Sequence, residues 1–417
     1  MNTPKPPAGP LLTPGRLLIL VTLAGWLAFV LMPQLLVLVG ISSYGMWYLD
    51  SYAVLAAVDA VRQGIPMAPG LANPLDPLGR DHKYSDWWFA MRWLGLTRES
   101  NFLVGTTWAG AFAVAAWGTL RPRNFRETAW LAALFLAPGV LLAVHRANND
   151  LVVFVLIAIC GVAAADPGWV RQAVAIAALV LATGLKFYPA PVALGFLWVR
   201  PVRRMAAPLA LALLAAGATL ASVWSQLKRA QFTFEATVHT TGAPLLWRDL
   251  GWPDATSLWF TVAIVGLGAA VLAATRCTAG LAEGGGRRER LLAAMGAIVV
   301  VACFIAGVSY AYRWIFALWM ALWLWREAGE ALAPRRRWTV RAGLALLLAC
   351  FWLDGLFCLV VNLCLMPMAV ERQHALQLTW RLWTQPLQWL LVILLAGWLL
   401  EGALATGRAW RSARAAA

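Results

Sequence analysis

The sequence predicts an all-α integral membrane protein, a polytopic bundle of about 10–12 transmembrane helices. Of its 417 residues, 61% are hydrophobic and 13% charged, whereas soluble proteins average roughly 45–50% and about 25%. Segments such as LLILVTLAGWLAFVLMPQLLVLVG are apolar throughout and approach the roughly 20 residues that a helix needs to cross a bilayer. They lack the period-two alternation of membrane barrels, which excludes that class. We expect residues 1–417 to form a single membrane domain.

The apolar segments give the expected spans in order. They lie at 17–40, 101–120, 128–145, 150–165, 173–185, 189–199, 205–224, 256–275, 292–309, 315–328, 343–366 and 386–403. The first is too long for a cleaved signal sequence and has no A-x-A site, so we expect it to remain as a helix. The fifth and sixth are too short to cross alone, so residues 173–199 are expected to form a broken or re-entrant helix pair.

Charge sets the expected orientation. Most of the 34 Lys and Arg residues, including the runs RPRNFR, RPVRR, GGGRRER and APRRRW, fall on the side of both termini. Because basic loops stay in the cytoplasm, we expect a multi-pass protein of the inner (plasma) membrane with both termini cytoplasmic. Orientation and attraction to anionic membrane lipids account for these runs. The formal charge of +15 has no compact basic domain to carry it, so no nucleic-acid partner is expected.

Several site classes have no support in the sequence. The six cysteines mostly lie in or beside expected spans without CxxC or CxxH spacing, so we interpret them as packing residues, and we expect no metal site. Nucleotide-binding and hydrolase fingerprints are absent, and we expect no cofactor. Asp354 lies in the middle of an expected span, where it serves either as a helix-packing hydrogen-bond partner or in an ion pathway.

Polar residues near the membrane gather on the extracytoplasmic side. Three cations there, Arg146, Lys186 and Arg313, lie at span ends, where ionisable groups usually pair or serve a ligand. Taken singly, each equally fits a side chain that snorkels to the headgroups. Together they favour a phosphate ligand, which Arg binds through paired hydrogen bonds and Lys through a compact charge. Their polar neighbours are expected to share this pocket: His145, Asn148, Asn149, Asp150, Tyr188, Tyr310 and Tyr312.

The large extracytoplasmic loop, 41–99, contributes a carboxylate and a polar cluster. Asp50 fits a general base whose pKa is raised by apolar surroundings. It equally fits the N-cap of SYAVLAAVDAVRQG, which predicts an amphipathic helix on the outer leaflet, with Asp59 paired to Arg62. Further along, DHKYSDWW offers substrate contacts or, as spacing alone slightly favours, an interfacial aromatic loop. Its candidate substrate residues are His82, Lys83, Tyr84 and Asp86.

The ordered combination of these motifs resembles the GT-C class of membrane glycosyltransferases, and within it glycosyltransferase family 87. The resemblance is carried by YLDSYAVLAAVDAVRQGIP, ANNDLVVFVLIA, TGLKFYPAPVALGFL and YAYRWIFALW, and spans about residues 45 to 320. It implies a GT-C-like fold and a polyprenyl-phosphate sugar donor, as in mannosyltransferases of that family. It further implies that Asp50 is the base and that Arg146, Lys186 and Arg313 bind the donor phosphate.

The expected activity is therefore transfer of a hexose, with mannose suggested by the resemblance, to a lipid or polysaccharide acceptor. Transfer would proceed with inversion on the extracytoplasmic side. A transporter or flippase of lipid-linked saccharides is the alternative of a different class, because the same cations would bind phosphate during passage. A ligase or polymerase that uses lipid-diphosphate glycans is a third reading, separated from the first by its donor.

Overall fold

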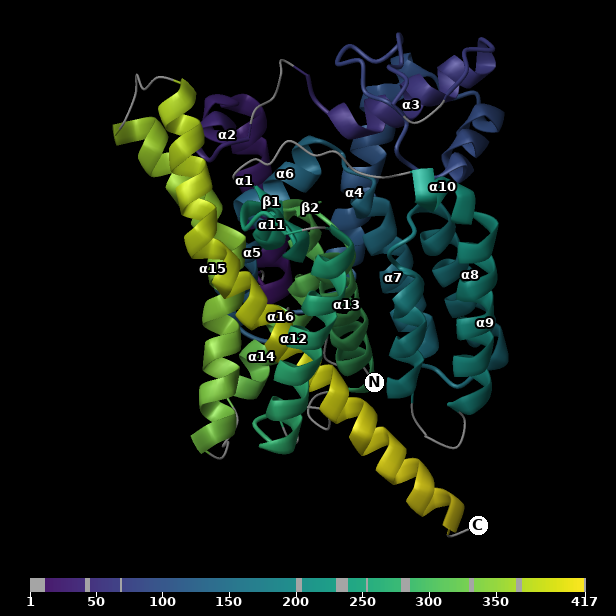
Figure 1. The fold of residues 1–417 in the computed structure, drawn as a ribbon, viewed down its shortest axis with the longest axis vertical. Helices are drawn as coiled ribbons and strands as arrows, with labels where there is room; N and C mark the ends of the chain where they lie inside the picture. Colours follow the sequence, from purple (N-terminus) through teal and green to yellow (C-terminus); the bar gives the residue numbers. More distant parts are fainter. Residues whose placement is uncertain are drawn as a thin grey trace, which may run out of the picture.

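The fold is a bundle of long and short helices (Figure 1). The computed structural model describes residues 12–41, 46–67, 70–199, 205–229, 239–252, 254–278, 286–329, 334–364 and 370–415. The predicted basic run RPVRR at 200–204 lies outside the described residues. Within them, β-structure is limited to one antiparallel pair of two-residue strands.

The elements follow the apolar segments of the sequence. The first half contains α1 (Pro14–Leu31), α2 (Gln34–Leu38), α3 (Leu49–Arg62), the 3-10 helices η1 (Asp86–Leu94) and η2 (Arg98–Ser100), α4 (Asn101–Thr119), α5 (Phe125–Phe135), α6 (Pro138–His145), α7 (Asp150–Ala164), α8 (Trp169–Leu185), η3 (Ala190–Trp198) and α9 (Ala206–Ser222). The second half contains α10 (Trp224–Arg229), β1 (Thr240–Thr241), α11 (Ala243–Asp249), α12 (Asp254–Ala274), α13 (Arg287–Ala306), β2 (Ser309–Tyr310), η5 (Ala311–Ala317), α14 (Leu318–Ala328), α15 (Pro334–Cys364) and α16 (Val370–Ala415).

Several helices are long and apolar enough to span a membrane, which makes this a multi-pass membrane protein. In the described part of the chain six helices meet that criterion, and a seventh span is formed if α5 and α6, bent by 59° at Pro138, are taken together. Three shorter apolar helices, α7, α8 and α9, accompany them, so the expected number of about 10–12 spans stays a prediction. The 15 residues of α7 extend only about 22 Å, less than the roughly 30 Å hydrocarbon core, and α8 and α9 have 17 residues each.

Of the short helices, α6 and α7 occupy protected positions in the bundle, whereas α8 and α9 expose apolar side chains. α7 packs against α8 and α4, and α6 packs against η5. α13 lies centrally, in contact with η3, η5, α14 and α16. The core between them is aromatic: the Phe154 ring of α7 stacks on Trp319 of α14 with centroids 4.1 Å apart. Neighbouring helices therefore bury the apolar faces of α6 and α7, each of which is too short to cross the membrane alone.

The helical chain is interrupted between α8 and η3, close to the interruption that the sequence predicts. α8 ends at Leu185, and a nine-residue 3-10 helix, η3, begins at Ala190 after Lys186–Pro189. α8 starts at Trp169, four residues before the expected boundary. That the pair is re-entrant stays a prediction.

The large loop carries a helix whose surroundings differ from the prediction. α3 is buried along most of its length, including every residue from Val54 to Ala60, and it packs against η1, η2 and α4. The predicted helix is present and protein covers most of it; that it lies on the outer leaflet stays a prediction. The predicted Asp59–Arg62 pair is present at 3.3 Å, and Arg98 also binds Asp59.

The two ends of the bundle are formed by different segments of the chain (Figure 1). α2, α3 and α10 lie at the upper end of the view, which we call the α3 end. At the opposite end, which we call the arginine end, side chains from three separate basic segments interlock. Arg326 binds Glu127 at 2.8 Å and Glu289 at 2.7 Å, and Arg123 binds Glu289 at 3.1 Å. Residues from three of the segments that the sequence assigned to one side are thus in contact.

Two residues outside the site have clear packing roles. Asp354 of α15 accepts a hydrogen bond of 3.1 Å from the Trp380 indole of α16, which favours the packing interpretation over an ion pathway. Gly242 has φ of 118°, and a Cβ there would overlap the carbonyl oxygen of Gly307. Only glycine therefore fits where β1 meets the segment that leads to β2.

Candidate functional site

The site is organised by the turn between α6 and α7. Ala147 in this turn and Tyr48 before α3 are non-glycine residues with positive φ, 41° and 61°. The backbone amides of Tyr48 and Asp50 donate to the carbonyls of His145 and Arg146, each at 2.9 Å. The start of α3 is thereby fixed against the turn. Strained backbone of this kind is concentrated at functional sites.

Asp50 lies in the first turn of α3 and is only 3% exposed. Arg146 donates to its two carboxylate oxygens, Nε to Oδ2 at 3.0 Å and Nη2 to Oδ1 at 2.7 Å. Asn148 donates to Oδ2 at 2.6 Å. The N-cap position belongs to Tyr48, and the Asp50 carboxylate binds side chains of the turn instead. The N-cap interpretation of Asp50 is therefore wrong.

The charge state of Asp50 follows from these partners. Burial alone would raise the pKa of this carboxyl group, but the Arg146 and Arg80 charges, together with the hydrogen bonds from Arg146 and Asn148, lower it below the ordinary value. Ionised partners favour the ionised carboxylate. The expectation that apolar surroundings raise this pKa is wrong, because the polar turn and the loop surround the carboxylate.

A second carboxylate, Asp150, is the first residue of α7 and is fully buried. Lys186 forms an ion pair with its Oδ1, and the Tyr188 hydroxyl donates to the same oxygen at 2.7 Å. The Arg313 Nε lies 3.5 Å from Oδ2. The side chains predicted from ANND, KFYP and YAYR therefore meet at one carboxylate, although they lie on three separate segments.

Aromatic rings surround the cations. The Lys186 ammonium lies 5.5 Å from the ring centre of Tyr84, 5.8 Å from Tyr188 and 6.0 Å from Tyr312. The Arg313 guanidinium lies 4.8 Å from the Tyr188 ring centre, and Tyr310 stacks on Tyr312. Ring faces stabilise desolvated cations without neutralising them, so the positive charge stays available to an anion.

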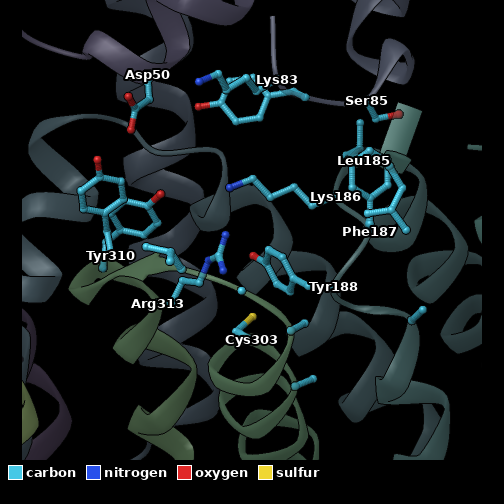
Figure 2. A pocket seen from close by; sticks show the side chains of 18 of the residues that line it. Asp50, Lys83, Ser85, Leu185, Lys186, Phe187, Tyr188, Cys303, Tyr310 and Arg313 are labelled. Atoms are coloured by element: carbon cyan, nitrogen blue, oxygen red, sulfur yellow. The ribbon is translucent and has the colours of Figure 1, made fainter. Parts of the chain in front are cut away.

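These groups surround a cavity of about 460 Å³, within the usual range of small-molecule sites. Figure 2 shows Lys186 and Arg313 pointing toward the middle of the pocket, with Asp50 on one side and Tyr188 on the other. Its polar lining residues are Asp50, Arg80, Asp81, Lys83, Tyr84, Ser85, Arg146, Lys186, Tyr188, Tyr310, Tyr312 and Arg313. The apolar wall comes mainly from α8, η3, α9, α10 and α13 and includes Leu185, Pro191, Leu220, Leu227 and Ala306.

The lining has an excess of positive charge. Five basic and two acidic side chains face the cavity. Asp150 and Asp76 stand behind them and bind Lys186 and Arg80, which leaves an excess of one positive charge. A cationic, partly aromatic chamber beside an apolar wall suits an anionic group attached to a hydrophobic chain.

Six of the predicted pocket residues do not line the cavity. Two of them, Asn148 and Asp150, bind the lining residues Asp50 and Lys186 from behind. His145 packs its ring against Trp47, with centroids 4.5 Å apart. Asn149 is fully buried beneath the turn. His82 stacks on Phe89 at 4.7 Å, and Asp86 exchanges hydrogen bonds with Gln226. They support the loop and the turn without facing the pocket. Burial lowers the pKa of His82.

The sequence interpretation missed Arg80 and Cys303. Arg80 donates to the Leu49 carbonyl at 2.8 Å, lies 3.4 Å from Asp50, and binds Asp76. Its position four residues after Asp76 was a local signal for that pair. The contact with Asp50, 30 residues upstream, had no local signal. Cys303 was interpreted as a packing residue, yet it lines the cavity (Figure 2).

In the described part of the chain, no group of three or more His, Cys, Asp or Glu side chains is placed to hold a metal ion. The arrangement offers anion binding through Arg146, Lys186 and Arg313, and proton acceptance at Asp50. Comparison with protein-family models, curated proteins and solved structures finds no match to this chain.

Proposed function

We propose that the protein is a membrane glycosyltransferase that moves a hexose from a polyprenyl-phosphate sugar to a lipid or polysaccharide acceptor. The single observation that carries this proposal is the meeting of Arg146, Lys186, Arg313 and the Asp50 carboxylate in one cavity with an apolar wall. The cations suit the donor phosphate, and the apolar wall suits the first part of the polyprenyl chain.

The proposed reaction is one in-line displacement. The acceptor hydroxyl oxygen bonds to the anomeric carbon as the bond from that carbon to the phosphate oxygen breaks, and the electron pair stays on the phosphate. The hydroxyl proton passes to Asp50, and the sugar configuration inverts. Polyprenyl phosphate gains negative charge as it leaves, and nearby cations stabilise charge that develops in the transition state.

Asp50 requires a change of partners for this role. In the resting site Arg146 holds both of its oxygens, which weakens Asp50 as a base. A donor phosphate would compete for the Arg146 guanidinium, and the release of Asp50 would raise its basicity. Binding of the donor would thereby prepare the base that acts on the acceptor.

The α3 end would face the extracytoplasmic side and both termini the cytoplasm, in the plasma membrane of the cell. This orientation rests on the basic segments gathered at the arginine end and on the tendency of basic loops to stay in the cytoplasm.

The decisive test is a transfer assay with purified protein and a panel of polyprenyl-phosphate sugars with labelled hexoses. Label should pass to an acceptor from at least one donor, with release of polyprenyl phosphate. If no donor supports transfer, while liposomes that contain the protein move lipid-linked saccharides across the bilayer, the protein is a transporter instead. Transfer from lipid-diphosphate glycans alone would identify a ligase or polymerase.

A further inference from the structure

A second cavity, of about 570 Å³, lies far along the bundle from the first, where α4, α7, α8 and α13 meet. α4 and α8 both pack against α7, and α7 supplies Ala158, Ile159, Val162 and Ala163 to the lining. We call this hollow the α7 groove. Most of the residues that line it have small or apolar side chains.

The groove is open because its wall residues are small. Gly118 of α4 lines it, and in the described structure a Cβ added at Gly118 would meet no atom within 4 Å. Ala115 and Ala163 line the same hollow. On a helical surface of a membrane protein, such a hollow exposes apolar walls to lipid.

Charge is concentrated at one end of the groove, where Arg288 lines the cavity and Arg121, outside the lining, reaches the backbone of Gly118. Arg121 Nε and Arg288 Nη2 both donate to the Gly118 carbonyl oxygen, at 3.2 and 3.3 Å. Each guanidinium carries five N–H donors. Among the described residues no carboxylate forms an ion pair with either of them. Two like charges on one carbonyl repel one another, so an anion bound between them would stabilise both.

The other arginine that lines the groove is already neutralised. Arg171 of α8 forms an ion pair with Asp166, and both line the cavity. Arg121 and Arg288 therefore supply the excess positive charge. Basic pockets between membrane helices are the sites where anionic lipid headgroups bind.

We propose that the α7 groove binds one anionic phospholipid, with the headgroup phosphate between Arg121 and Arg288 and an acyl chain along the apolar floor. The apolar walls favour a phospholipid over a free phosphate, since a soluble anion would use only the charged end. This site lies at the arginine end, separate from the cavity around Asp50.

The test is native mass spectrometry of the purified, detergent-solubilised protein titrated with phosphatidylglycerol, and with phosphatidylcholine of the same acyl chains. The wild-type protein should bind one phosphatidylglycerol at least fivefold more tightly than phosphatidylcholine. Gly118→Leu fills the groove, and Arg288→Gln removes charge from the headgroup position. Each should lose most of this preference.

Matched variants make the result specific. Gly110 lies on the same helix, also has open space around it, and does not line the groove. Arg408 lies near the end of α16. Gly110→Leu and Arg408→Gln should bind phosphatidylglycerol as the wild type does.

Unchanged phosphatidylglycerol binding in both Gly118→Leu and Arg288→Gln would overturn the proposal, as would equal binding of the two lipids by the wild type. Displacement of the lipid by millimolar glycerol 3-phosphate would assign the charged end to a soluble phosphate and would also overturn it. A thermal unfolding midpoint for Gly118→Leu close to that of Gly110→Leu establishes that lost binding reflects a filled groove and not a misfolded protein.

Discussion

Asp50 and Asp150 are both buried acids in the same site, but their surroundings give them different roles. Asp50 borders the cavity and has partners that a ligand can replace. Asp150 lies behind the cations and binds Lys186, Tyr188 and Arg313 at once. A carboxylate that positions several cations is expensive to protonate or move. Asp50 is therefore the candidate base, and Asp150 is a positioning residue.

Substitution of Asp50 by Asn separates its role as proton acceptor from its ion pair with Arg146. Asp50→Asn should abolish sugar transfer because the proton acceptor is lost. Donor binding should be retained or become several-fold tighter, because Arg146 no longer has a carboxylate to hold it. The measurements are transfer and donor affinity on purified protein. Asp59→Asn, on the same helix but bound to Arg62 and Arg98, is the control and should transfer normally. Undiminished transfer by Asp50→Asn would remove Asp50 as the base.

The pH dependence of transfer follows from the lowered pKa of Asp50. In the free enzyme Asp50 stays ionised down to below its ordinary value of 3.8, so the acid limb of kcat/KM should lie below that value. When the donor phosphate occupies Arg146, the pKa of Asp50 rises, so the acid limb of kcat should lie at higher pH. The same limb in both profiles would contradict an exchange of partners.

Because the pKa of Asp50 is lowered in the folded protein, the ionised Asp50 cluster stabilises the fold. A carboxyl group with a depressed pKa in the folded state stabilises the fold above its unfolded pKa and loses that contribution as the pH falls through its folded pKa. Between pH 5 and 8 this contribution is therefore constant.

Removal of Arg313 tests the phosphate site. Arg313→Ala should weaken donor binding by about 2 kcal/mol, roughly 30-fold, because a charge-assisted contact is lost. Isothermal titration with a non-transferable donor analogue measures the change. Arg381→Ala is the control, since Arg381 binds Asp249 away from the cavity. Wild-type affinity in Arg313→Ala would return Arg313 to the snorkelling interpretation.

The sequence predicted the cations of the site better than their neighbours. Arg146, Lys186 and Arg313 stood out because charge at a span end is costly, and all three line the cavity. His145 and Asn149 do not. Successive residues at a helix end point in different directions, so adjacency to Arg146 did not place His145 in the pocket. Side-chain direction in the non-helical turn at 146–149 depends on the positive φ of Ala147, which the sequence does not signal.

At the scale of elements, the position of Arg313 depends on how η5 packs. η5 lies against α6 and α13, and in each contact a glycine of the partner helix lies against the η5 backbone. A Cβ added at Gly139 of α6 would crowd the carbonyl oxygen of Ala311. A Cβ added at Gly296 of α13 would overlap the carbonyl oxygen of Phe316. Because the neighbour is backbone in each case, η5 itself would have to move.

Gly296→Ala should therefore destabilise the protein by about 1–3 kcal/mol, the usual cost of overpacking, and weaken donor binding through displacement of Arg313. Thermal unfolding in detergent and donor affinity measure the two effects. Gly266→Ala on α12, where a Cβ would meet no atom of the described structure within 4 Å, should leave both unchanged or raise stability slightly. A Gly296→Ala protein with normal stability and affinity would show that η5 is not held as tightly as its packing indicates.

The positions of the helices were predictable, but their lengths and bends were not. Uninterrupted apolar runs located α4, α12 and α13 because a helix in lipid must satisfy its own backbone. The single expected span at 128–145 is instead α5 and α6, bent by 59° at Pro138. Proline removes a helix hydrogen bond, yet whether the chain bends sharply there depends on packing against η5 and α15.

At the scale of the whole molecule, two charged regions lie at opposite ends of the bundle. At the arginine end, Arg123, Arg326, Glu127 and Glu289 join segments far apart in sequence. At the α3 end, cations and carboxylates surround a cavity instead of neutralising one another completely. The sequence placed the three basic segments of the arginine end on one side because their spacing alternates with the apolar spans. The convergence of three distant segments on Asp150 required the tertiary fold.

The most direct test is a cryo-EM structure of the protein with a non-transferable polyprenyl-phosphate sugar analogue. The phosphate should lie within hydrogen-bond distance of Arg146, Lys186 and Arg313. Arg146 should have moved away from Asp50, and the first isoprene units should lie along Leu220 and Leu227. A phosphate bound elsewhere, with the Asp50–Arg146 pair intact, would contradict the proposed role of this cavity.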